Sequence, residues 1–252
     1  MSGQIHEIGT PHGPARAHTT DAVGSARGTL VLGHGAGGGI ESVDLLAVTD
    51  EAAGAGWRVV RVEQPWLVAG KRIAAAPPKL DEGWRAVLHA LRDDDVLSGP
   101  LVLGGRSAGA RVACRTAAEH GAAGVLALAF PLHPPGKPEK SRASELTAVS
   151  VPLVVVQGET DAFGSPADVA AALSGHAGAS VYAVPGDHSL KRNVDVVAAA
   201  ALSWLGELTG RQNGAGSSGG ARPDGRAIRV TPLCVVTAST PSDVMTNRQP
   251  AA

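Results

Sequence analysis

Cysteine and aromatic side chains are scarce in this sequence of 252 residues. The two cysteines, Cys114 and Cys234, have a spacing that matches neither a zinc site nor a redox motif, so we expect no bound metal. They suggest no disulfide framework either, which makes the reducing cytoplasm the expected location. Aromatic residues make up 3% of the chain and hydrophobic residues 44%, so a sizeable core must be built mainly from alanine, valine and leucine.

The chain also lacks an excess of either charge and has no long hydrophobic run. Its 22 basic and 23 acidic residues give a formal net charge of −1. Without a broad basic field, neither nucleic acid nor an acidic membrane surface is an expected partner. No apolar stretch reaches the length of about 18 residues that a membrane span requires. Residues 1–10 also lack the apolar centre of a signal peptide.

Short runs rich in valine and leucine alternate with helix-like segments along most of the chain. Such runs, bounded by Gly or Pro, are typical of buried parallel strands. They occupy residues 29–35, 57–65, 100–105, 124–131, 151–158 and 180–186. The helix-like segments occupy residues 42–55, 79–96, 107–120, 166–175 and 192–208. This alternation predicts one α/β domain over residues 1–208, with a mostly parallel sheet and helices on both faces.

The two ends of the chain have weaker patterns. Residues 4–20 are compatible with a lead-in hairpin. Residues 209–252 begin with a stretch rich in Gly, Ser and Arg and show no periodicity, which predicts a disordered tail. The alternative for this tail is that the run LCVV, residues 233–236, adds an edge strand to the sheet.

Two segments match the pattern G-x-S-x-G, which often marks a nucleophilic serine on a sharp turn. The match around Ser107 follows a buried strand and precedes a helix, which is the context that a nucleophile elbow requires. The match around Ser218 has neither neighbour, and we discard it. A Gly-rich turn without chemistry remains the alternative for Ser107. Arg106 and Arg111 are expected to brace this turn through ion pairs.

Two further polar residues follow later strands in the order that a Ser–acid–His triad requires on this kind of sheet. Asp161 comes three residues after one strand and His188 just after the next. Both therefore lie at carboxyl ends of strands, where ligands bind in open α/β sheets. Asp161 could instead cap the following helix, Asp187 is a rival acid, and His188 could be a solvated loop histidine.

The sequence GHGAGGG, residues 33–39, follows the first strong strand and supplies a flexible loop. In serine hydrolases of this type, one donor of the oxyanion hole comes from this loop and the other from the residue after the nucleophile. We therefore predict that the backbone amides of Ala36 and Ala108 bind the oxyanion. The loop lacks the G-K-[ST] ending of a phosphate-binding loop, so a nucleotide site is the weaker interpretation.

Taken together, LVLGHGAGGG, GGRSAGAR, FPLHPPGKPEK, VVVQGETDAFG and GDHSL resemble the small α/β-hydrolase family related to dienelactone hydrolases. That family includes testis-expressed protein 30 and the third regulatory subunit of the NSL acetyltransferase complex. The resemblance covers about residues 8–208 and implies Ser107, Asp161 and His188 as the triad. Ala108 and Ala110 depart from the Met and Gly of the family's GGRSMGGR-like stretch, but no catalytic side chain is lost.

The expected function is cleavage of a small ester, thioester or related acyl substrate, without a cofactor. A large cap domain has no room in the roughly twenty residues after FPLHPP. The candidates for lining the substrate pocket are His34, Trp66, Phe130, His133 and Phe163. The alternatives are a non-catalytic interaction module on the same scaffold and, less favoured, a peptidase; the oligomeric state and the substrate are left open.

Overall fold

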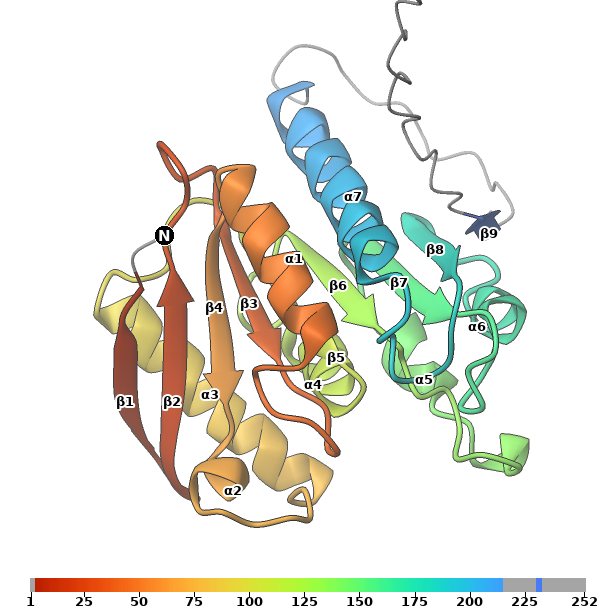
Figure 1. Ribbon diagram of the computed structural model, residues 1–252, viewed down its shortest axis with the longest axis horizontal. Helices are drawn as coiled ribbons and strands as arrows, with labels where there is room; N and C mark the ends of the chain where they lie inside the picture. The colour runs from red at the N-terminus through yellow and green to blue at the C-terminus, as the bar shows by residue number, and fades with distance from the viewer. Residues whose placement is uncertain (1–2, 215–229, 233–252) are drawn as a thin grey trace, which may run out of the picture.

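A computed structural model describes residues 3–214 and 230–232 of the chain. Within this part the strands form one sheet in the order β1-β2-β4-β3-β5-β6-β7-β8-β9 (Figure 1). The two contacts β1–β2 and β2–β4 are antiparallel, and all the others are parallel. The sheet is therefore the mostly parallel one that the alternating pattern predicted.

The central strands are short and fully buried, which explains their continuous apolar sequences. Every residue of β3, β6 and β7 is buried. The strands are β1 Ile5–Thr10, β2 Gly13–Thr20, β3 Thr29–Gly33, β4 Arg58–Glu63, β5 Leu101–Arg106, β6 Gly124–Leu128, β7 Leu153–Gly158, β8 Ala179–Val184 and β9 Val230–Pro232. The predicted lead-in hairpin is confirmed as β1 and β2, which pair from Ile5↔His18 to Thr10↔Gly13.

Helices cover both faces of the sheet, so the sheet separates the hydrophobic core into two layers (Figure 1). The helices are α1 Val43–Gly54, α2 Pro65–Val68, α3 Pro77–Asp93, α4 Ala108–Thr116, α5 Ala143–Thr147, α6 Pro166–Ala172 and α7 Val194–Gly214, with a 3-10 turn at Pro138–Lys140. One layer packs α1 and α7 around Trp57 and Trp204. The other packs α3, α4 and α6 around Trp84 and Phe130.

No large cap domain is present between β6 and β7, as the sequence predicted. This connection holds only the 3-10 turn and the five-residue helix α5. None of the helices in the described part of the chain is long and apolar enough to cross a membrane.

The predicted domain boundary at residue 208 falls inside α7, which continues to Gly214. Beyond it, Val230–Pro232 pairs with β8 in parallel, with Val181 opposite Val230. The run LCVV, like most of the predicted tail, lies outside the described residues, so the prediction of a disordered tail stays a prediction.

Candidate active site

Ser107 lies on a sharp turn between β5 and α4, in a backbone conformation that L-residues rarely adopt. Its φ is 52° and its ψ is −107°. The amide of Ser107 donates to the carbonyl oxygen of Leu128 at 2.9 Å, which anchors the turn to β6. A strained backbone at the end of a buried strand persists only where surrounding contacts hold it, and such strain clusters at functional sites.

His188 lies on the loop between β8 and α7, and its ring connects Ser107 to Asp161. Nε2 of His188 is 3.0 Å from Oγ of Ser107, and Nδ1 is 2.8 Å from Oδ2 of Asp161. The hydrogen bond to Asp161 places a proton on Nδ1 and leaves Nε2 free to accept one from the serine. The ring of Phe163 packs on the imidazole with centroids 4.1 Å apart, which limits rotation of the ring.

The side chain of Asp161 is fully buried, and hydrogen bonds satisfy its carboxylate. Besides His188, it accepts from Nε2 of Gln157 at 2.9 Å and from the amide of Phe163 at 2.8 Å. Asp161 does not cap helix α6, because Ser165 caps it in a capping box with Asp168. A buried carboxylate with these partners is suited to orient the imidazole.

Asp187, the rival acid, points elsewhere. Its Oδ1 accepts from the amide of Ser189 at 3.0 Å and from the Ser189 hydroxyl at 2.6 Å. The side chain therefore closes a local turn on the surface and makes no hydrogen bond to His188. Of the two acids that the sequence left open, only Asp161 is bonded to the imidazole.

Arg106 and Arg111 have the ion-pair partners that the sequence could not identify. Nε of Arg106 is 3.3 Å from Oδ2 of Asp44 on α1. Nε of Arg111 donates to Oε2 of Glu145 on α5 at 2.8 Å. The turn that carries Ser107 is therefore bound to a helix on each face of the sheet.

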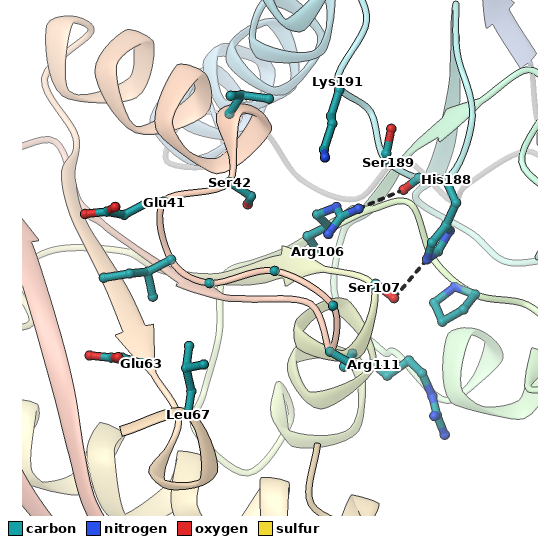
Figure 2. Close-up of a pocket in the computed structure, with 18 of the residues that line it drawn as sticks. Glu41, Ser42, Glu63, Leu67, Arg106, Ser107, Arg111, His188, Ser189 and Lys191 are labelled. Atoms are coloured by element: carbon teal, nitrogen blue, oxygen red, sulfur yellow. Dashed lines mark hydrogen bonds between the residues drawn. The ribbon is translucent and has the colours of Figure 1, made fainter. Parts of the chain in front are cut away.

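Ser107 and His188 open into a cavity of about 1000 Å³ at the carboxyl edge of the sheet (Figure 2). Ala36 and Ala108, the predicted oxyanion donors, both line it. Ala108 is the first residue of α4, where amides have no acceptor within the helix and the helix dipole favours negative charge. The position suits an oxyanion.

Of the five predicted pocket residues, only Phe163 lines this cavity. Phe130 is fully buried in the core. Trp66 is buried against His34, with ring centroids 5.3 Å apart, and borders a separate cavity of about 120 Å³. His133 is partly exposed, and its Nδ1 bonds the carbonyl oxygen of Pro134. The predictions for Phe130, Trp66 and His133 as lining of this cavity are therefore wrong.

His34 supports the glycine loop through hydrogen bonds and does not line the cavity. Its Nδ1 donates to the carbonyl oxygen of Gly35 at 2.9 Å, and its Nε2 accepts from the amide of Gln64 at 3.2 Å. Burial lowers the pKa of His34 below the ordinary value of 6.5, so the ring is neutral. His34 therefore orients the glycine loop, and the prediction that it lines the cavity is wrong.

The cavity wall that faces Ser107 was not predicted from the sequence. It combines apolar and charged side chains from the loop before α1 and the first residue of α1, from β2 and β4, from α2 and from the loop after His188. These residues are His18, Ile40, Glu41, Ser42, Val43, Glu63, Leu67 and Lys191. In Figure 2 Glu41, Glu63 and Leu67 lie across the cavity from Ser107, and Lys191 extends toward it. For the wall residues other than His18 and Lys191, one available signal was their position at or after the carboxyl ends of β3 and β4, the edge where Ser107 also lies.

The described residues contain no group of three or more His, Cys, Asp or Glu side chains that could hold a metal ion. Cys114 is buried in α4, and burial raises the pKa of its thiol to about 12. Its thiol is therefore protonated and unreactive at neutral pH. Cys234 lies outside the described residues.

Comparison with known proteins assigns the family. The alpha/beta hydrolase domain family matches residues 26–201, and the chain belongs to this family.

Solved structures agree at the level of the fold. An alpha-beta serine hydrolase homologue from Coxiella burnetii superposes with a TM-score of 0.69 at 18% identity, covering 81% of this chain and 98% of that one. A lidless serine hydrolase from Xanthomonas campestris gives 0.67 at 18%, covering 82% and 95%. A thermophilic esterase from Thermogutta terrifontis gives 0.62 at 16%, covering 82% and 99%.

Proposed function

We propose that this protein is a serine hydrolase that cleaves a small ester, thioester or related acyl compound. The observation that carries the proposal is the chain of two hydrogen bonds from Ser107 through His188 to the buried Asp161, of 3.0 and 2.8 Å. Nucleophile and base at this distance, with the base oriented by a third group, are the signature of an activated serine.

In the proposed reaction His188 Nε2 takes the proton of Ser107 Oγ as that oxygen attacks the substrate carbonyl. The amides of Ala36 and Ala108 bind the oxyanion of the tetrahedral intermediate. The imidazolium then gives its proton to the leaving alcohol or thiol, and an acyl-enzyme remains. Water activated by His188 releases the acid and restores Ser107. Asp161 holds the tautomer and stabilises the imidazolium throughout.

The cavity favours a small molecule as the substrate. Its volume of about 1000 Å³ is within the range of small-molecule sites, and the apolar side chains of Ile40, Val43 and Leu67 line it beside charged ones. The proposal needs no metal or cofactor. The motif resemblance supports a finer placement near the dienelactone-hydrolase-related family, and the cysteine content supports a cytoplasmic location.

A fluorophosphonate probe tests this proposal, because it reacts only with activated serines. Peptide mapping of wild-type protein should find the label on Ser107 and not on Ser218. The Ser107→Ala variant should carry no label. A panel of p-nitrophenyl esters, acyl thioesters and peptide amides then ranks the substrates. Folded wild-type protein that is neither labelled nor active on any of these would overturn the proposal and favour the non-catalytic interaction module.

A further inference from the structure

Arg106, the residue just before Ser107, points away from the strand and toward the loop of His188. Its Nη2 donates to the carbonyl oxygen of His188 at 3.2 Å (Figure 2). The side chain is 11% exposed, so most of the guanidinium is shielded from water. The residue next to the nucleophile in sequence therefore holds the backbone of the base, 82 residues further along the chain.

Asp44, in the first turn of α1, supplies the counter-charge. Its side chain is fully buried, and its Oδ2 is 3.3 Å from Nε of Arg106. Burial raises the pKa of the Asp44 carboxyl, and the Arg106 guanidinium opposes that rise. A buried charge that loses its partner is strongly destabilising, so each member of this pair fixes the place of the other.

The guanidinium also packs against the glycine loop that precedes α1. A Cβ atom added to Gly35 would lie 3.0 Å from Nη1 of Arg106, and one added to Gly38 would lie 3.5 Å from it. This loop carries Ala36, the proposed oxyanion donor. One side chain therefore contacts both the loop of the base and the loop of the oxyanion hole.

The loop of His188 needs such support, because its backbone is strained. Leu190 and Asn193 have φ values of 50° and 53°, in the left-handed region that disfavours residues other than glycine. Strained conformations persist only where surrounding contacts fix them. The hydrogen bond from Arg106 to the carbonyl of His188 is one such contact, immediately at the base.

We infer that Arg106 is a positioning residue, which Asp44 holds in place and which sets His188 and the glycine loop at their working distances from Ser107. The expected effect on kcat rests on the proposed function, whereas the expected effect on the loop of His188 does not. The planar guanidinium holds its nitrogens in a fixed fork, so Nη2 can donate to the carbonyl oxygen of His188 while Nε lies beside Asp44 as an ion pair without a hydrogen bond. The single ammonium of a lysine cannot reproduce this geometry.

Arg106→Lys is the first test, since it keeps the positive charge that opposes Asp44. Arg115→Lys is the matched control. Arg115 also forms a partly buried ion pair, with Nε 2.8 Å from Asp81, but it does not line the cavity. On the best ester, kcat of Arg106→Lys should fall about 10²-fold, the scale of a misplacement of about 1 Å, while KM changes little. Arg115→Lys should keep wild-type kcat.

A second readout does not depend on catalysis. In wild-type protein the Nδ1 proton of His188, bonded to Asp161, should give a protected low-field proton resonance by NMR. Arg106→Lys and Asp44→Asn should weaken or broaden it and speed amide exchange over residues 186–191. Arg115→Lys should do neither. Circular dichroism confirms that each variant is folded.

These two measurements separate the possible failures. If wild-type protein is inactive but Arg106→Lys, unlike Arg115→Lys, disturbs the resonance and the loop, the positioning role stands and the proposed hydrolase function fails. If Arg106→Lys leaves the resonance and the exchange rates unchanged, the positioning role is refuted. A rise in KM for anionic esters alone, with kcat unchanged, would also refute it, because Arg106 would then be a substrate ligand.

Discussion

Gly109, two residues after Ser107, packs directly on Gly33 of β3, with no room for a side chain between them. A Cβ atom on Gly109 would lie 2.8 Å from the Cα of Gly33 and would overlap its carbonyl group. The helix that follows Ser107 therefore approaches the sheet as closely as backbone allows. This contact sets where the N-terminus of α4 points.

Gly109→Ala should destabilise the protein and inactivate it. Overpacking a rigid contact costs about 1–3 kcal/mol, and for a domain of this size each kcal/mol lowers Tm by about 2–4 °C. Gly206→Ala is the control, since its Cβ would meet nothing within 4 Å on α7. It should raise stability by about 0.5–1 kcal/mol. Equal Tm values for the two variants would contradict this account of the elbow.

Asp161→Asn should lower kcat by about 10⁴-fold, because an amide facing Nδ1 favours the wrong tautomer of His188. Asp187→Asn should cost far less, since the Asp187 carboxylate bonds only to Ser189 among the described residues. Steady-state kinetics on the best ester measures both. If Asp187→Asn proved the more damaging of two folded variants, the assignment of the acid would fall.

Stability should decline as the pH falls below 6.5, in part through His34. Burial lowers the pKa of His34, so the unfolded chain binds the proton at a higher pH than the folded protein does. The unfolded state therefore gains stability between 6.5 and the lower folded pKa, while at higher pH the full contribution of the neutral ring is present. Burial lowers the pKa of His120 as well, which adds to the same slope.

His34→Gln should flatten this slope, and His34→Gln with His120→Gln should flatten it further. The measurement is the difference in unfolding free energy between about pH 7.5 and pH 5.5, which does not depend on the absolute stability of each variant. A slope equal to that of wild-type protein in the double variant would rule out both rings as its source.

Truncation after Gly214 should leave fold and activity intact. The segment removed includes β9, but that strand has only three residues and lies at the edge of the sheet. A three-residue edge strand should add little to the free energy of folding, whereas α7 up to Gly214 is retained. Differential scanning calorimetry should show a fall in Tm below about 5 °C; a larger fall would mean that the segment supplies stability on the kcal/mol scale.

The strands and the order of Ser107, Asp161 and His188 could be predicted because they follow from local patterns. Apolar runs between Gly and Pro mark buried strands, and each polar residue stands just after one. Chain order and the motif resemblance already predicted Asp161 rather than Asp187 as the acid, and the structure adds the hydrogen bond from Nδ1 of His188 to Asp161.

The pocket wall could not be predicted, because local turns decide where side chains point. Phe130 and Phe163 both follow strands, yet Ala129 has a φ of 45° and the chain turns Phe130 into the core. His18 and Glu63 reach the cavity because β2 and β4 run antiparallel, with Arg16 opposite Glu63. No periodicity in the sequence encodes that pairing.

The short connection between β6 and β7 bears on the kinetics of any reaction at Ser107. The described residues place no cap over Ser107, so turnover in the proposed reaction should begin without a lag and should not accelerate at a lipid–water surface. In the proposed reaction the open cavity gives water access to the acyl-enzyme, so transfer of the acyl group to another alcohol should compete with hydrolysis. Selectivity of the proposed reaction should then depend on the wall of Ile40, Glu63, Leu67 and their neighbours, which do not belong to the proposed triad and can change without altering it.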